Sequence, residues 1–195
     1  MDAKRLWHTI RLWTSLGSYS RGAYLRKYHV FKKAGKHFSY QPRYVPLYAN
    51  LIKVGDYVTI ASNVAFDTHD GIHTILSADD LIIPTGYTHD DFHEGMGCIE
   101  IGNHVFIGAG SHIGYNVKIG DNVVITSCSV VTNDIPSNSV VRGNPARVIC
   151  SLSQFLNMKL AKRAFPNNLD HAMGKYVGNE LEEWLWHDFE ESRIK

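Results

Sequence analysis

The feature that most constrains this chain is a repeat of six residues. From Ile101 the sequence reads IGNHVF, IGAGSH, IGYNVK, IGDNVV, ITSCSV and VTNDIP, six consecutive hexads that each begin with an aliphatic residue. The fifth position is small or β-branched in every one of these hexads, and the second position is Gly in the first four. An earlier block, VGDYVT, IASNVA and FDTHDG, follows the same rule until its last hexad. This period is neither the one of about 3.6 residues of a helix nor the one of 2 residues of a sandwich strand.

Three short strands per turn of a coil explain a period of six. Eighteen residues then make one triangular coil, and the first-position aliphatic residues stack from coil to coil in its interior. The nine hexads predict a mainly β protein, a parallel β-helix of about three or more coils, and the alternative is a sandwich rich in glycine turns. The fourth position favours residues that tolerate positive φ, with Tyr57 and Cys128 as exceptions. These corner residues are Asn63, His69, His104, Gly110, Asn116, Asn122 and Asp134.

Composition narrows the function classes. The chain has 195 residues, 44% of them hydrophobic, which indicates a folded protein of ordinary domain size. Its 20 Lys and Arg nearly balance its 19 Asp and Glu, so we expect no nucleic-acid partner. The three cysteines have no CxxC spacing and predict neither a disulfide framework nor a zinc ribbon. No signal-peptide or membrane-spanning run is present, so a cytoplasmic location is expected.

Two helical flanks are expected around the repeat. The sequence predicts a basic amphipathic segment over 1–37, the β-helix with its loop over 38–150, and helices over 151–195. Residues 1–37 hold nine Lys or Arg and one Asp, so this segment either contacts a membrane surface or is a solvated helix face. Apolar residues at helical spacing predict a packing face on each flank. These are Leu6, Ile10 and Trp13 in the first flank, and Leu181, Trp184, Leu185 and Phe189 in the last.

The repeat fails between its two blocks. Ile101 follows Val54 by 47 residues, one fewer than eight hexads, so about thirty residues over 71–100 leave the coil as a loop. Excursions of this length in a compact repeat are more often binding loops than connectors. Four histidines and several carboxylates fall in or beside it, which makes it the candidate site. They are His69, His73, His89, His93, Asp70, Asp79, Asp80, Asp90, Asp91 and Glu94.

His69 is the candidate general base. It ends the regular coil just before the loop, and imidazole suits proton transfer at neutral pH. The alternative is that His69 only fills a positive-φ corner, as we expect for His104. Asp70 occupies a fifth position, where the other hexads have small or apolar residues, so either the coil has already opened there or its carboxylate orients the imidazole. His93, next to Glu94, is the loop histidine that we expect to contact an acceptor, together with Asp67.

The run from Ile119 to Ile149, IGDNVVITSCSVVTNDIPSNSVVRGNPARVI, resembles the closing coil of the hexapeptide-repeat acyltransferases. The resemblance spans about Val54 to Ile149 and is strongest to sugar O-acetyltransferases. It implies a left-handed parallel β-helix, a homotrimer with active sites between subunits, and acetyl-CoA as donor with no metal. Thr68, His69 and Asp70 match the context of the family's catalytic histidine.

The same resemblance implies the residues that bind the coenzyme. Ala109 and Ser127 match small corner residues along the pantetheine arm, Thr132 and Asn133 match a Thr-Lys pair, and Arg147 matches a phosphate-binding residue. Asn133 departs from the usual lysine, which leaves one phosphate contact open. The expected function is acetyl transfer to a hydroxyl of a sugar or glycan by direct attack. The alternatives are N-acetylation of an amino sugar or antibiotic, and a silent trimeric scaffold. A zinc site is not expected, because the histidine spacings do not match known ligand patterns.

Overall fold

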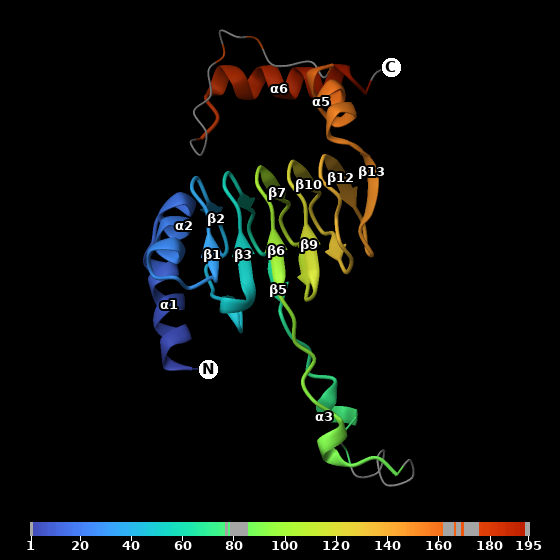
Figure 1. The fold of residues 1–195 in the computed structure, drawn as a ribbon. Helices are drawn as coiled ribbons and strands as arrows, with labels where there is room; N and C mark the ends of the chain where they lie inside the picture. The colour runs from blue at the N-terminus through green and yellow to red at the C-terminus, as the bar shows by residue number, and fades with distance from the viewer. Residues whose placement is uncertain are drawn as a thin grey trace. The chain divides into compact units, whose positions relative to one another are not determined.

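A parallel β-helix forms the core of the chain. The computed structural model describes residues 2–76, 78, 86–161, 166, 169 and 176–193. Three sheets run along the coil stack (Figure 1), in the strand orders β1-β3-β6-β9, β13-β12-β10-β7-β4-β2 and β11-β8-β5. All of their pairings are parallel except β12 with β13, which form an antiparallel hairpin. The strands are β1 Lys33–Ala34, β2 Ser39–Tyr40, β3 Ile52–Val54, β4 Thr59–Ile60, β5 Ala65–Asp67, β6 Ile99–Ile101, β7 Val105–Ile107, β8 His112–Gly114, β9 Val117–Ile119, β10 Val123–Ile125, β11 Val130–Val131, β12 Ser139–Arg142 and β13 Arg147–Ser151.

The interior of the coil is built as the repeat predicts. Each of the six hexads from Ile101 begins with a buried residue, and the fifth-position residues of the same hexads are buried too. Two of these fifth positions are serines, and their hydroxyls are satisfied within the corner: Ser111 Oγ and Ser129 Oγ both donate to the carbonyl of Thr126, at 3.1 and 2.7 Å. Buried polar groups paired in this way cost little. The predicted mainly β fold is therefore confirmed.

The corner column differs from the expected one in four places. Tyr57 and Cys128, the expected exceptions, adopt positive φ of 57° and 59° like their neighbours. Asp134 and His69 do not belong to the described residues with positive φ. The coil path therefore imposes the left-handed corner even on residues that disfavour it, and the corner at His69 follows a different path. His69 is thus no ordinary corner histidine, whereas His104, with φ of 54°, is one.

The β-helix begins with a coil that precedes both repeat blocks. β1 pairs with β3 and β2 with β4 in parallel register, so the first coil starts before residue 38. The hexad AGKHFS carries the signal for this coil, with Gly35 second and His37 fourth at a φ of 53°. The next hexad, YQPRYV, breaks the pattern with Pro42, and the third side has no strand before η1 (Ala49–Leu51).

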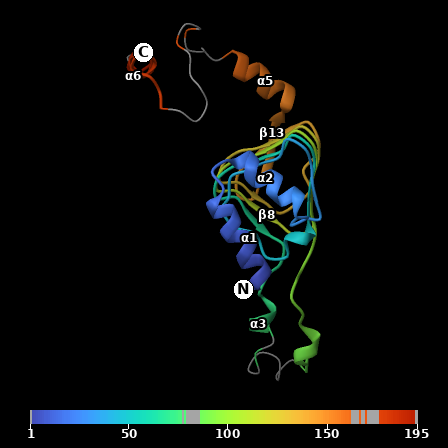
Figure 2. The same ribbon diagram turned by 90° about the vertical axis from the view of Figure 1, so that its left-hand side faces the viewer.

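Helices α1 (Ala3–Thr14) and α2 (Ser18–Lys27) lie across the first coil, as Figure 2 shows from that end. The expected packing face of α1 is wrong: Leu6, Ile10 and Trp13 are exposed, and the helix buries His8 and Leu12. The reason is that polar contacts help to hold this helix, among them His8 Nδ1 at 2.8 Å from the hydroxyl of Tyr24.

The chain divides into two compact units, Met1–Phe155 and Leu156–Lys195. Helix α5 (Leu152–Leu160) crosses the boundary, and the second unit contains α6 (Asn179–Glu191). Of the four apolar residues expected to form a packing face on α6, Leu181 is buried and Trp184 half-buried, whereas Leu185 and Phe189 are exposed. Among the described residues, no helix is both long and apolar enough to cross a membrane.

Candidate active site

The loop leaves the coil as two paired arms. The backbone N–H of Asp70 donates to the carbonyl of Gly95 at 2.9 Å, and that of Gly97 donates to the carbonyl of Thr68 at 3.0 Å. His69 and Met96 form an antiparallel bridge between these two bonds. Beyond the arms lie α3 (His73–Leu76) and η3 (His89–Asp91), while Asp79 and Asp80 fall outside the described residues. His69 therefore stands at the base of the loop, on backbone that is held from both sides.

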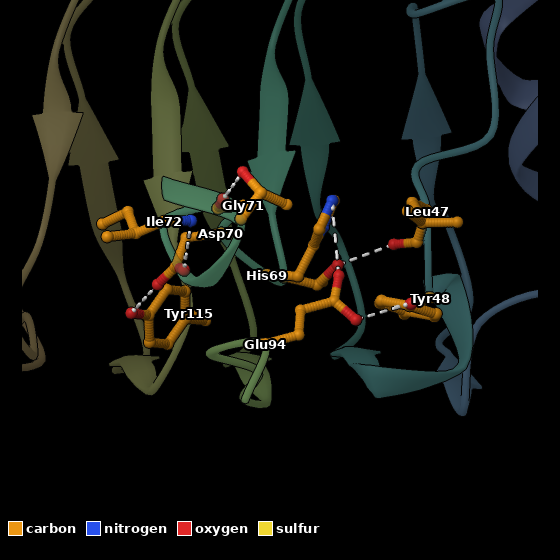
Figure 3. Close-up of polar contacts among 10 residues, drawn as sticks. Leu47, Tyr48, His69, Asp70, Gly71, Ile72, Glu94 and Tyr115 are labelled. Atoms are coloured by element: carbon orange, nitrogen blue, oxygen red, sulfur yellow. Dashed lines mark hydrogen bonds and ion pairs between the residues drawn. The ribbon is translucent and has the colours of Figure 1, made fainter. Parts of the chain in front are cut away.

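A carboxylate and a phenol surround the His69 ring (Figure 3). Nε2 of His69 lies 3.9 Å from Oε1 of Glu94, which comes from the returning arm. The other oxygen of Glu94 accepts a 2.9 Å hydrogen bond from the hydroxyl of Tyr48, and the Tyr48 ring meets the imidazole edge to face at 5.3 Å between centroids. Tyr48 itself has a φ of 50°, a conformation that is uncommon outside glycine. This hydrogen bond raises the pKa of Tyr48, so the phenol remains a donor.

The two nitrogens of His69 have different surroundings. Nδ1 is buried and has no hydrogen-bond partner among the described residues, while the side chain as a whole is 30% exposed. Nε2 therefore is the nitrogen that we expect a bound molecule to reach. For Nε2 to accept a proton, the neutral ring must carry its own proton on Nδ1. After the transfer, the cationic ring faces the Glu94 carboxylate, which is also largely shielded, at 26% exposure. The geometry suits a general base with an electrostatic partner.

Asp70 turns to the next coil. Its Oδ2 accepts a hydrogen bond of 2.6 Å from the hydroxyl of Tyr115, and its Oδ1 accepts one of 3.1 Å from the backbone N–H of Ile72. The Tyr115 bond, followed by that from Ile72, holds the pKa of the Asp70 carboxyl below its ordinary value. Gly95 leaves the room that this carboxylate needs, because a Cβ there would lie 2.4 Å from Oδ2. Asp70 thus fastens the root of the loop, and the carboxylate beside His69 is that of Glu94.

Neither of the two expected acceptor residues, Asp67 and His93, makes a polar contact with His69 among the described residues. Asp67, at the end of β5, has Oδ2 at 3.2 Å from Nδ1 of His112 on the neighbouring strand β8, and both side chains are half exposed. His93 precedes Glu94 in the returning arm and is exposed. Both remain predictions as acceptor contacts.

The expected coenzyme residues divide between the two corners of the coil that bound the β5-β8-β11 sheet. One corner lies where its strands begin and the other where they end, and we call these corners the two edges of the sheet. Ala109 and Ser127 follow β7 and β10 at one edge, whereas Thr132 and Asn133 follow β11 at the edge where His69 lies. All four are exposed. The backbone N–H groups of Ala109 and Ser127 donate to no acceptor among the described residues, so they are available to a ligand that approaches this small-residue corner.

Arg147 has a second arginine opposite it. It begins β13 and pairs in register with Arg142 at the end of β12, and both side chains are exposed. Like charges directly opposite in an antiparallel pair destabilise it, unless an anion lies between them. The arginine pair is therefore a candidate phosphate contact. Asn133, which stands where the resemblance expects a lysine, follows β11 and adds no charge. No metal site accompanies it: over the described ranges, no three His, Cys, Asp or Glu side chains gather as ligands.

Three of these residues were missed by the sequence reasoning. Tyr48 and Tyr115 reach the site from other coils, and no local pattern links them to His69 or Asp70. Arg142 had a possible signal, because the tight GNPA turn between it and Arg147 predicts a hairpin that brings the two together.

Known proteins share both the repeat and the fold. A family model described as bacterial transferase hexapeptide (six repeats) matches residues 98–133. Protein CapG of Staphylococcus aureus is 38% identical over 143 residues, which is 73% of each chain. The structure of a maltose O-acetyltransferase from Clostridium difficile 630 is 29% identical with a TM-score of 0.53, and covers 76% of this chain and 84% of its own. A galactoside acetyltransferase in complex with coenzyme A is 27% identical with a TM-score of 0.51, over 84% and 86% of the two chains.

Proposed function

This chain belongs to the hexapeptide-repeat acyltransferases, enzymes with a left-handed parallel β-helix, and from that premise we propose that it transfers an acetyl group from acetyl-CoA to a hydroxyl of a sugar or glycan. The observation that carries the proposal is the pairing of His69 with Glu94 at the root of the loop. The names of the similar solved enzymes, which act on maltose and galactosides, support a sugar as acceptor.

His69 is the general base of the proposed reaction. Its Nε2 takes the proton of the acceptor hydroxyl as the hydroxyl oxygen attacks the thioester carbonyl carbon. The carbon–sulfur bond then breaks, and the proton on Nε2 passes to the departing thiolate, which leaves as the thiol. Glu94 stabilises the imidazolium that exists between these two transfers, and Tyr48 holds Glu94 in place. No covalent enzyme intermediate is needed, because the acceptor attacks directly.

The chain's own groups fit a coenzyme A donor. The unpaired amides of Ala109 and Ser127 suit the amide carbonyls of a pantetheine arm, and the absence of large side chains permits close approach. Arg142 and Arg147 provide two guanidinium groups for phosphate. Thr132 and Asn133 follow β11 on the same edge as His69, with β8 between β11 and β5. Metal is not required by this scheme.

The division of these residues between two edges supports a site formed by two copies. In this arrangement the Ala109 and Ser127 edge of one copy lies against the His69 edge of another, and a closed ring of three copies repeats the groove three times. A homotrimer is therefore part of the proposal.

The test is release of free thiol from acetyl-CoA with matched acceptors. Galactose, maltose and an oligosaccharide offer hydroxyl groups, and glucosamine and galactosamine add one amine to the same ring. We expect turnover with neutral sugars and an acetyl ester, labile to mild base, in the product. Turnover confined to the amino sugars, with a base-stable amide as product, would assign N-acetylation instead. No turnover and no acetyl-CoA binding by calorimetry would leave a scaffold.

A further inference from the structure

Helix α1 carries an apolar face that is exposed among the described residues. At 100° per residue, this face lies on the side opposite His8 and Leu12, which the helix buries. Its side chains are Leu6 at 43% exposure, Trp7 at 60%, Ile10 at 45% and Trp13 at 62%. Two tryptophans and two aliphatic residues therefore share one face of this helix of twelve residues and form an exposed apolar patch. Exposed patches of this kind mark interaction sites.

The attachment of α1 does not depend on this face. Arg5 Nε donates to the carbonyl of Val45 at 2.8 Å, and the backbone N–H of Val45 donates to Thr9 Oγ1 at 3.3 Å. His8 contacts the Tyr24 hydroxyl, and Leu12 is fully buried in the core. The inner face thus holds the helix on the first coil, and the apolar outer face is free for a partner.

Positive charge borders the apolar face on both sides. Lys4, Trp7 and Arg11 follow one another at helical spacings of three and four residues, so two exposed cations lie beside Trp7. On the other side, the guanidinium of Arg43 lies 5.7 Å from the ring centroid of Trp13 and donates to the carbonyl of Trp13. Residues 1–37 as a whole contain nine basic residues and a single acidic one.

From this combination we propose that α1 lies in the surface of an anionic lipid bilayer, with Trp7, Ile10 and the rest of the apolar face between the headgroups. Tryptophan favours the interface of a membrane, and flanking Lys and Arg add attraction to anionic lipid. A second copy of this chain on the same face would bring two helices together that carry Lys4, Arg5 and Arg11 and no acidic residue, and the repulsion between these cations disfavours it. Because α1 lies at the end of the coil stack, it does not cover the outer faces of the three sheets (Figure 2), which stay available for association between copies.

The position of α1 also relates the proposed lipid contact to the candidate active site. The helix forms one wall of a groove of 410 Å³, with Lys4, Arg5 and His8 on one side and Tyr48 on the other. Tyr48 holds Glu94 beside His69. The groove therefore extends from α1 to Tyr48, the residue that contacts both Glu94 and the His69 ring. If the acceptor is attached to a lipid, as the proposed function allows, this arrangement places the site near the lipid-facing helix.

The experiment is flotation of the full chain with vesicles. Vesicles of phosphatidylcholine mixed with phosphatidylglycerol are compared with vesicles of pure phosphatidylcholine, each at low and high salt. We expect binding to the anionic vesicles, weakened by salt, and a loss of roughly tenfold or more for the double variant Trp7→Ser with Ile10→Ser. The matched control is Trp186→Ser, which removes a tryptophan of similar exposure, 58%, from α6 and leaves vesicle binding unchanged. Both residues on α1 are exposed, so the thermal unfolding midpoint of the double variant stays that of the wild type.

Three results overturn the proposal. The wild type fails to float with anionic vesicles, or the double variant floats as well as the wild type. In the third, the double variant lowers the molar mass in sedimentation equilibrium and no vesicle binding is seen, which makes the α1 face an interface between copies. None of these outcomes depends on catalytic activity, so they leave the proposed acetyl transfer to its own test.

Discussion

At the scale of single residues, one repeat position serves two purposes. His104 and His69 both occupy the fourth position of a hexad, but His104 has a φ of 54° at a regular corner and stacks on Tyr57 at 5.1 Å. His69 lies where the chain turns out into the paired arms, and its ring meets Glu94 and Tyr48 instead. Both histidines have the same position in the repeat pattern. What distinguishes them is the path of the backbone after the residue.

The relation between Glu94, Tyr48 and His69 predicts a graded loss of activity. Glu94→Gln keeps the shape but removes the negative charge that faces Nε2, so we expect kcat to fall on the order of a hundredfold with little change in the KM for acetyl-CoA. Tyr48→Phe removes only the hydrogen bond that positions Glu94, and its loss is smaller. Steady-state kinetics of the two variants and the double variant measure this.

The double variant decides how Tyr48 acts. If Tyr48 works through Glu94, adding Tyr48→Phe to Glu94→Gln costs little more, because the position of the lost charge no longer matters. Losses that multiply would contradict a positioning role. Tyr57→Phe is the matched control, since its hydroxyl has no hydrogen bond among the described residues.

The bond between Tyr115 and Asp70 predicts a pH-dependent contribution to stability. The pKa of Asp70 is lower in the folded chain than in the unfolded one, where about 3.9 is ordinary. Its contribution is therefore complete above about pH 5 and is lost as the pH falls through the lowered value. Tyr115→Phe removes the largest cause of that shift, so the variant unfolds at a lower temperature than the wild type near neutral pH, and the difference narrows in acid.

Thermal unfolding of both proteins over this pH range provides the check. A gap between the two midpoints that stays constant down to about pH 2 would show that the phenol contributes by packing rather than through the Asp70 carboxylate. Tyr57→Phe again is the control, and its midpoint follows the wild type at every pH.

At the scale of elements, the repeat predicts strands well because every hexad contains its own strand and corner. Three short strands per coil follow from the period alone, whereas the first coil contains only one clear hexad, AGKHFS, and escaped the prediction. The apolar stripe of α1 was recognised, but an amphipathic pattern does not say what covers the apolar side. For α1 the coil covers the opposite side.

The candidate site was only partly predictable for a physical reason. His69 stands at a break of the pattern, which a sequence displays. Glu94 lies 25 residues further along the chain and Tyr48 lies 21 residues before His69, and only the pairing of the loop arms and the stacking of coils bring them together. Asp70 attracted attention because a carboxylate is unusual at a fifth repeat position, and two readings were open: an opened coil, or a carboxylate that orients the imidazole. The structure shows the chain leaving the coil there, with the Asp70 carboxylate bonded to Tyr115.

The β12–β13 hairpin predicts a coenzyme phosphate contact. Arg142→Ala removes one of two guanidinium groups that lie opposite each other, so we expect the KM for acetyl-CoA to rise about tenfold while kcat changes little. The KM for 3′-dephospho-acetyl-CoA serves as the comparison: it is already high and the substitution leaves it unchanged. An equal rise of KM with both donors would place Arg142 away from the 3′-phosphate of the coenzyme. Arg193→Ala, in the other unit, is the control for the loss of a surface charge.

At the scale of the whole molecule, the division of the site between two sheet edges predicts complementation between inactive variants. Ser127→Arg blocks the small-residue edge, and His69→Gln removes the base from the other edge. Each variant alone is inactive. Co-expressed with different tags and purified through both, they form mixed assemblies in which some grooves combine an intact edge from each copy.

Activity of these mixed assemblies is the measurement. We expect a substantial fraction of the wild-type rate, because a groove between two copies needs only one intact edge from each. Mixed assemblies as inactive as their parents would place the coenzyme and His69 of each site in the same chain.

The central claim is that His69 is the base of an acetyl transfer, and the direct test separates binding from chemistry in a single variant. His69→Gln keeps a polar side chain at the root of the loop and is compared with the wild type by calorimetric titration with acetyl-CoA and by turnover with the best sugar of the panel. The account predicts unchanged acetyl-CoA affinity and a turnover lower by at least about a hundredfold. Turnover equal to the wild type, with acetyl-CoA still bound, would contradict it.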